Sequence, residues 1–155
     1  MPYILISLGA FLLDHHVKEY TNTHRLQGET ESYLNKKIVL RNLHNPNGAL
    51  GIFKNHKEDK EKLTFAVLLV LLWEFIRSLL GKGSKAEKLG LALLLGGGWS
   101  NYYEQKSKGY VTDYVSFNVK FEKLRRLVFN ISDFFIMAGA LIYAVAKVTK
   151  GFKNS

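Results

Sequence analysis

The stretch that organises this chain is residues 96–133, which holds three polar motifs between two apolar runs: Gly96-Gly97-Gly98-Trp99-Ser100-Asn101-Tyr102-Tyr103-Glu104-Gln105, Gly109-Tyr110-Val111-Thr112-Asp113-Tyr114 and Phe129-Asn130-Ile131-Ser132-Asp133. Asp113 and Asp133 lie at the edges of segments whose composition is typical of membrane-buried helices. An ionisable side chain in that setting is costly, so a functional role is the default hypothesis for it. We therefore treat Asp113 and Asp133 as a candidate catalytic pair.

Composition favours a membrane protein over a nucleic-acid-binding protein. The 155 residues suffice for one domain, and 22 Lys and Arg against 13 Asp and Glu give a net charge of +9. That charge suits either nucleic acid or an anionic membrane surface. However, the apolar residues, 47% of the chain, are clumped into runs, and no nucleic-acid-binding motif is present. We expect membrane lipids as partners and no nucleic acid.

The apolar runs predict a polytopic α-helical membrane protein with four transmembrane helices, at about residues 3–20, 63–80, 89–103 and 129–148. The whole chain, 1–155, then forms a single integral membrane domain with both termini on one side. Residues 21–62 and 104–128 lie outside the membrane, and β-branched runs at 37–43 and 110–119 predict a small β-element there. The Lys and Arg count alone does not settle the orientation.

The first apolar run leaves two alternatives open at Asp14. A helix that continues to about Tyr20 approaches the ~20 residues that a bilayer requires and places Asp14 inside the span. A helix that ends at Leu13 leaves Asp14 at the interface. In the continuous helix Asp14 and Lys18 are four residues apart and can form an ion pair, as Glu74 and Arg77 can in the second span.

The residues do not predict a metal or an organic cofactor. The chain has no cysteine and no His-Glu-x-x-His motif. His15 and His16 are adjacent, so on a helix they point in directions about 100° apart and cannot bind one metal together.

Five motifs in this order, on a four-span pattern, resemble the bacterial lipoprotein signal peptidases, also called signal peptidase II. The first two are Asp14-His15-His16-Val17-Lys18 and Asn45-Pro46-Asn47-Gly48-Ala49-Leu50-Gly51. In the third-helix signature Gly96, Gly97 and Asn101 fit the family pattern, whereas Ser100, Glu104 and Gln105 depart from it. The segments 109–114 and 129–133 match the last two motifs, with Ser132 in place of an alanine. The departures indicate a divergent member.

The resemblance implies an intramembrane aspartic endopeptidase with a small extracytoplasmic β-element in the bacterial cytoplasmic (inner) membrane. Such an enzyme cleaves diacylglyceryl-modified prolipoproteins before the lipidated cysteine, without a metal or cofactor, and we expect a monomer. The family pattern assigns the catalytic dyad to Asp113 and Asp133. It assigns substrate-binding or supporting roles to Asp14, Asn45, Asn47, Gly48, Asn101, Glu104 and Asn130.

Two neighbouring carboxylates suit this chemistry because they share one proton, so that the pKa of one of them rises. The ionised partner activates water, and the protonated partner donates to the carbonyl oxygen. The carboxamides of Asn45, Asn101 and Asn130 can orient the aspartates or the substrate backbone. An alternative is a non-catalytic membrane homologue that binds lipoproteins or acts as an adaptor, which the departures at Ser100, Glu104 and Gln105 favour.

Overall fold

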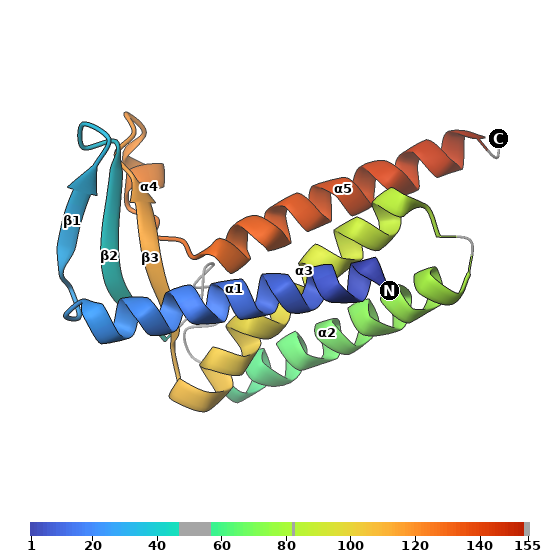
Figure 1. Ribbon diagram of the computed structural model, residues 1–155, viewed down its shortest axis with the longest axis horizontal. Helices are drawn as coiled ribbons and strands as arrows, with labels where there is room; N and C mark the ends of the chain where they lie inside the picture. Colours follow the sequence, from blue (N-terminus) through green and yellow to red (C-terminus); the bar gives the residue numbers. More distant parts are fainter. Residues whose placement is uncertain (47–56, 82, 154–155) are drawn as a thin grey trace.

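The computed structural model describes residues 1–46, 57–81 and 83–153. In these residues the chain forms five helices and three strands (Figure 1). They are α1 (Pro2–His24), β1 (Thr30–Tyr33), β2 (Ile38–Asn45), α2 (Lys57–Leu80), α3 (Lys85–Lys108), β3 (Val111–Phe117), α4 (Glu122–Arg125) and α5 (Ile131–Lys153).

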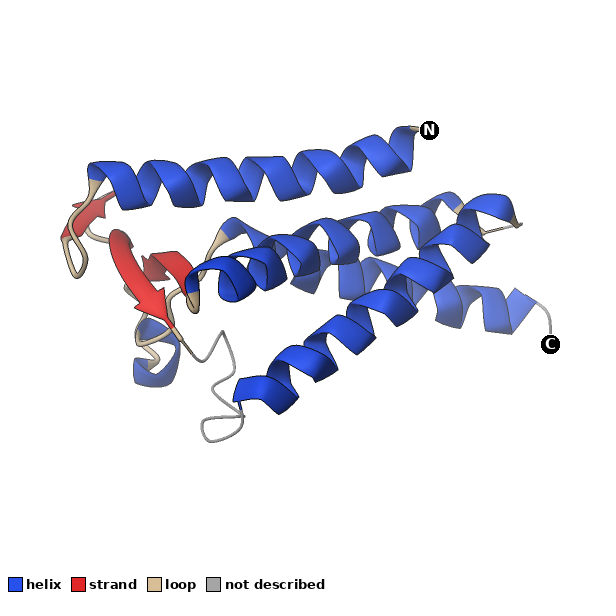
Figure 2. Cartoon of the chain, turned by 90° about the horizontal axis from the view of Figure 1, so that it is seen from below, coloured by secondary structure: helices blue, strands red, loops and turns tan. Residues whose placement is uncertain are grey.

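The helix α3 is the central element of the bundle, because it packs against α1, α2 and α5 (Figures 1 and 2). Its glycines allow this close approach. A Cβ atom added to Gly90 would lie 2.8 Å from the carbonyl oxygen of Gly139 on α5. One added to Gly96 would lie 2.4 Å from the carbonyl oxygen of Ser7 on α1. Small residues of this kind let helix backbones approach each other inside a membrane.

Both ends of α3 are defined by local sequence. Ser84 and Glu87 form a capping box at its start, in which each side chain accepts a hydrogen bond from the other residue's backbone N–H. Gly109 ends the helix in the left-handed conformation, with φ of 78°, which glycine adopts without steric cost. The chain therefore turns directly from the end of α3 into β3, the strand that carries Asp113.

The three strands form one antiparallel sheet in the order β1-β2-β3. In its register Leu43 pairs with Asp113 and Asn45 pairs with Val111. Alternate residues of a strand point to the same face, so Asn45 lies diagonally across from Asp113 on one side of the sheet. The strands expected at 37–43 and 110–119 thus appear as β2 and β3, whereas β1 and α4 were not predicted.

The outer faces of the helices are apolar and exposed. Among the described helices, α2 over Asp59–Leu80 and α5 over Ile131–Lys150 are long and apolar enough to cross a membrane. Their exposed side chains include Val70 and Trp73 on α2 and Leu141 on α5. A soluble protein would bury such faces, so the exposure indicates lipid as the solvent.

The helix bounds differ from the prediction at several ends. The helix α1 continues through Asp14 to His24, so the alternative that ended it at Leu13 is wrong. The helix α3 continues past residue 103 to Lys108, and its last turns carry Glu104 and Gln105. Both helices extend because their charged and polar residues have partners elsewhere in the protein. The ion pair predicted between Glu74 and Arg77 is confirmed, at 2.6 Å.

Candidate active site

Asp113 is buried on β3 and its carboxylate is held by two carboxamides. Its Oδ2 accepts a hydrogen bond from Nδ2 of Asn45 at 2.9 Å, and its Oδ1 accepts one from Nδ2 of Asn130 at 2.8 Å. The first partner comes from the neighbouring strand β2 and the second from the residue that precedes α5. The Asp113 side chain is therefore fixed from both sides.

Asp133 is fixed by the way in which α5 begins. Its Oδ2 accepts a hydrogen bond from the backbone N of Asn130 at 3.1 Å, while Oδ1 of Asn130 accepts one from the backbone N of Asp133 at 3.0 Å. This reciprocal pair is a helix cap. Oδ1 of Asp133 also accepts from Nδ2 of Asn101 at 3.1 Å. Asn130 thus contacts both aspartates and links them through one residue.

Both carboxylates line one cavity of about 350 Å³. Residues of α2, α3, β3 and the start of α5 form its walls, among them Thr64, Tyr102 and Gln105. The carboxylates are thus held by protein donors on one side and reachable by a ligand on the other.

The setting of Asp113 alters its protonation. Burial and, to a smaller extent, the negative charge of Asp133 raise the pKa of Asp113 to about 7, against the opposing effect of the hydrogen bonds from Asn45 and Asn130. Near neutral pH a large fraction of Asp113 therefore holds a proton. A neutral carboxyl group next to a second carboxylate can donate a proton and accept one in the same reaction cycle.

A buried ion cluster lies behind the two aspartates. The side chain of Lys18 on α1 is only 1% exposed, and its Nζ lies 2.7 Å from Oδ2 of Asp14 and 3.4 Å from Oε2 of Glu104. Lys18 also donates to Oδ1 of Asn101 at 2.6 Å. Because Oδ1 of Asn101 faces this ammonium, its Nδ2 faces Asp133. The lysine therefore sets which end of the Asn101 amide contacts Asp133.

Asp14 connects α1 to three other elements. Its Oδ2 accepts from Oγ of Ser100 on α3 at 2.7 Å. Its Oδ1 accepts from the hydroxyl of Tyr114 on β3 at 3.2 Å and from the backbone N of Ser132 on α5 at 3.0 Å. Sequence reasoning missed Tyr114 and treated Ser100 only as a departure from a family pattern. The i, i+4 spacing of Ser100 and Glu104, which matches that of Asp14 and Lys18, could have indicated two facing helix surfaces.

Glu104 lies in the buried cluster and is not among the residues that line the cavity. Its carboxylate accepts from the backbone N of Thr112 at 2.9 Å and from Oγ1 of Thr112 at 2.7 Å. Glu104 thus ties the end of α3 to the start of β3. The structure brings Asp113, Asp133, Asn45, Asn101 and Asn130 together and places Asp14 and Glu104 behind them. Asn47 and Gly48 lie outside the described residues.

The two buried serines Ser132 and Ser100 differ in their hydrogen bonds, so their alanine variants can be compared. Oγ of Ser132 is buried without a hydrogen-bond partner in the part of the chain that the structure describes. Because Ser132→Ala breaks no hydrogen bond of normal length, it is expected to leave the free energy of unfolding within about 1 kcal/mol of wild type. Ser100→Ala removes a hydrogen bond to buried Asp14 and is expected to lower it by about 1–3 kcal/mol. Thermal unfolding in detergent measures both; equal effects would contradict this assignment.

The chain is similar to known proteins over nearly its whole length. The profile of the signal peptidase (SPase) II family matches residues 6–149. The lipoprotein signal peptidase of Moorella thermoacetica is 27% identical over 142 residues, which cover 92% of this chain and 89% of the relative. That of Streptococcus pneumoniae is 27% identical over 143 residues, which cover 92% of this chain and 88% of the relative.

Two solved structures of bacterial membrane enzymes share the fold. One superposes with a TM-score of 0.82 at 18% identity, and the aligned part covers 99% of this chain and 92% of the solved chain. The other has a TM-score of 0.76 at 19% identity, and the aligned part covers 94% of this chain and 91% of the solved chain. Together with the exposed apolar faces of α2 and α5, this likeness identifies a membrane protein.

Proposed function

Because the chain belongs to the signal peptidase II family, we propose that it is an aspartic endopeptidase that removes the signal peptide from diacylglyceryl-modified prolipoproteins, cleaving before the lipidated cysteine. The observation that carries this proposal is the pair of buried aspartates, Asp113 and Asp133, held at one cavity by three carboxamides. This arrangement suits amide hydrolysis by an activated water.

In the proposed mechanism the dyad holds one proton between Asp113 and Asp133 and titrates as a unit. The ionised carboxylate takes a proton from a water in the cavity, and the oxygen of that water attacks the scissile carbonyl carbon. The protonated carboxyl donates to the carbonyl oxygen, and the dyad then protonates the leaving amine. Asn45, Asn101 and Asn130 keep the carboxylates in place through these steps, because each donates to one of them.

We further propose that α1 and α3 also cross the membrane, which gives four spans in one domain of residues 1–155. Three charged residues of these helices, Asp14, Lys18 and Glu104, are buried within the protein. Leu5, Leu8 and Leu12 of α1 are exposed instead. A helix of this kind has low mean hydropathy yet presents an apolar surface to lipid. Residues 21–62 and 104–128 would then lie on the outer side of the bacterial cytoplasmic membrane.

The proposed partner is a single lipid-modified prolipoprotein bound by a monomer. Its cleavage site would enter the cavity beside Tyr102 and Gln105. Asn47 and Gly48, which follow β2 in the sequence, would also contact it, a role that rests on the family motif alone.

Activity is expected to decline as the pH rises above about 7, because Asp113 then loses the proton that the dyad must donate. The sign follows from the raised pKa, since the protonated form persists up to about 7 and is lost above it. Measurement of kcat/KM against pH would show an alkaline limb there. Asn45→Ala removes a donor that favours the carboxylate, so this limb should move to higher pH. An alkaline limb at the same pH in wild type and in Asn45→Ala would contradict the role of Asp113.

The direct test is cleavage of a synthetic diacylglyceryl-modified prolipoprotein peptide by the purified full chain in lipid vesicles. The same peptide with an unmodified cysteine is the control substrate, and the protein should cleave it far more slowly. Mass spectrometry should place the cut directly before the lipidated cysteine. A folded protein that is inert towards several such substrates would overturn the proposal and favour a non-catalytic homologue that binds lipoproteins or acts as an adaptor.

A further inference from the structure

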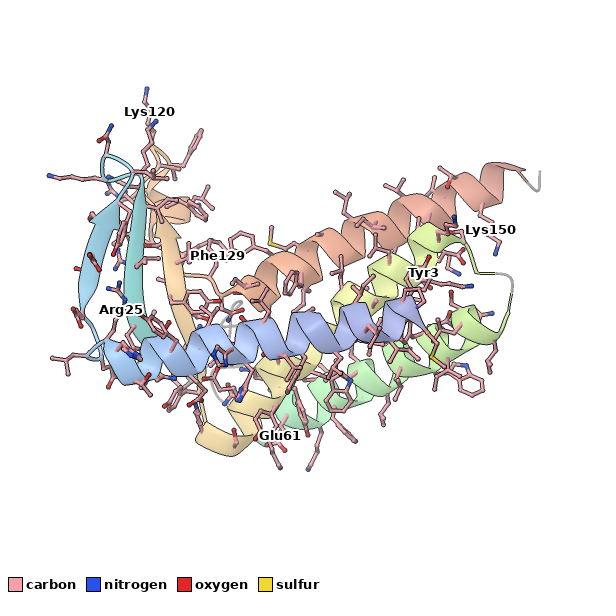
Figure 3. All side chains as sticks on the ribbon, viewed as in Figure 1. Tyr3, Arg25, Glu61, Lys120, Phe129 and Lys150 are labelled. Atoms are coloured by element: carbon pink, nitrogen blue, oxygen red, sulfur yellow. The ribbon has the colours of Figure 1, made fainter. Side chains whose placement is uncertain are left out.

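A short segment between β3 and α5 has a surface that the site described above does not use. It comprises Lys120-Phe121-Glu122-Lys123-Leu124-Arg125-Arg126-Leu127, here called the basic segment, and includes α4. All eight side chains are exposed. Figure 3 shows Lys120 projecting outward from this end of the sheet, and Figure 1 shows α4 beside β3.

The basic segment exposes three large apolar side chains at a spacing of three residues. Phe121 is 77% exposed, Leu124 42% and Leu127 43%. Backbone hydrogen bonds from Arg125 N to Phe121 O at 3.0 Å and from Leu127 N to Leu124 O at 3.1 Å maintain helical turns through the segment. At this spacing the three side chains lie on one side of the turns. In water such a group of apolar side chains would be unfavourable.

The charges of the basic segment are mostly positive and mostly unneutralised. Glu122 forms an ion pair with Arg126. Within residues 1–46, 57–81 and 83–153, no ion pair is formed by the three other cations, which are Lys120, Lys123 and Arg125. Cations that flank exposed apolar side chains match the chemistry of an anionic membrane surface.

The position of the basic segment in the chain places it near the headgroup layer. Only residues 128–130 separate it from Ile131, where the apolar part of α5 begins. Three residues and their flanking bonds span at most about 14 Å, which keeps the segment within about twice the ~5–8 Å thickness of one headgroup region. Val115 and Phe129 form a β-bridge across the junction, so the segment is also tied to β3.

We propose that the basic segment binds the surface of an anionic phospholipid bilayer, with Phe121, Leu124 and Leu127 inserted among the lipids. Lys120, Lys123 and Arg125 bind the lipid phosphates. This anchor holds the junction of β3 and α5, and with it Asp113 and Asp133, at a constant depth relative to the membrane. The inference rests on α5 crossing the membrane, as the proposed function requires, but it does not depend on catalysis.

The test uses the natural absence of cysteine from the chain. A nitroxide is attached to Leu124→Cys in the full-length protein, in vesicles of phosphatidylcholine with phosphatidylglycerol. Because oxygen concentrates in lipid and a nickel chelate in water, a lipid-inserted label collides more with oxygen. The control is Leu26→Cys, an 81% exposed position after the end of α1, where the nickel chelate should dominate.

A second arm tests the charges. With the natural cations in place, the nitroxide on Leu124→Cys should lie deeper when phosphatidylglycerol is present than in phosphatidylcholine alone. The triple variant Lys120→Gln, Lys123→Gln, Arg125→Gln should lose this difference, whereas the control Lys36→Gln, Lys37→Gln in the β1–β2 turn should keep it. Each cation is expected to contribute about 1 kcal/mol to the binding of the basic segment to anionic lipid, so each substitution should weaken that binding about fivefold. Inorganic phosphate at equal ionic strength should not displace the label from the membrane.

Two outcomes would overturn the proposal. Greater access of the nickel chelate than of oxygen at position 124 would show that water surrounds the segment. Shielding from both reagents would show that a second copy of the chain covers it. Neither readout involves peptide cleavage, so an inactive enzyme with a deep label would reject the proposed function and leave this anchor standing.

Discussion

Replacement of Asp113 or Asp133 by asparagine is expected to lower kcat for prolipoprotein cleavage by at least about 10³-fold, because a carboxamide cannot exchange a proton with water or with the substrate carbonyl. The substitution preserves the shape of the side chain. Its folding cost is limited to one mismatched hydrogen bond, about 1–3 kcal/mol, since Asn45 and Asn130 both donate to Asp113. Cleavage in vesicles and thermal unfolding separate the two effects.

The matched control is Glu74→Gln on α2, which neutralises a carboxylate outside the cavity. It should leave kcat close to that of wild type. If either aspartate variant cleaves at a near-normal rate while folded, the assignment of the dyad is wrong, although the family membership is not affected. If both asparagine variants are inactive and unfolded, Asp113→Glu and Asp133→Glu test the assignment instead. Each keeps the carboxylate charge but moves it by one methylene.

Lys18→Met is expected to lower the free energy of unfolding by about 3–5 kcal/mol, since it leaves the buried carboxylate of Asp14 without its ammonium and leaves Glu104 with Lys108 alone, at 3.5 Å. Asp14 and Glu104 would then face each other's charge in a region that water does not reach. The variant should also lose cleavage activity, because Asn101 is no longer held with its Nδ2 towards Asp133. Chemical unfolding in detergent and cleavage in vesicles measure the two losses.

A double variant separates charge from shape in this cluster. Lys18→Met with Asp14→Asn removes one charge of each sign, so much of the stability lost in the single variant should return. Activity should stay low, because the Asn101 amide remains free to turn. Unfolding of Lys18→Met at the same denaturant concentration as wild type would contradict the importance of this buried lysine.

The sequence predicted the elements whose signals are local. The pairing of Asp14 with Lys18 was predicted from their spacing on one helix. Gly109 is a local signal for the turn from α3 into β3, although the predicted helix ended at residue 103. The cap that joins Asn130 to Asp133 is also a local pattern, three residues apart. The family motifs supplied the order in which these elements occur.

The remaining features depend on contacts between distant segments. Nothing in the local sequence indicates that Lys18 reaches Asn101, or that Tyr114 donates to Asp14, which is 100 residues away in the chain. The charges of α1 and α3 lower the mean hydropathy of those helices, and only the fold shows that Asp14, Lys18 and Glu104 are buried. The strand β1 is short and polar, so its pairing with β2 decides its structure.

Asn130 makes the chemistry of this protein conditional on its folding. One residue uses its backbone N–H and its side-chain oxygen to wind the first turn of α5, and its side-chain nitrogen to hold Asp113. Fraying of that turn would remove one hydrogen bond from Asp113 and one from Asp133 at the same time, and would leave only those from Asn45 and Asn101. The proposed catalytic pair is therefore fully assembled only where the first turn of α5 is folded.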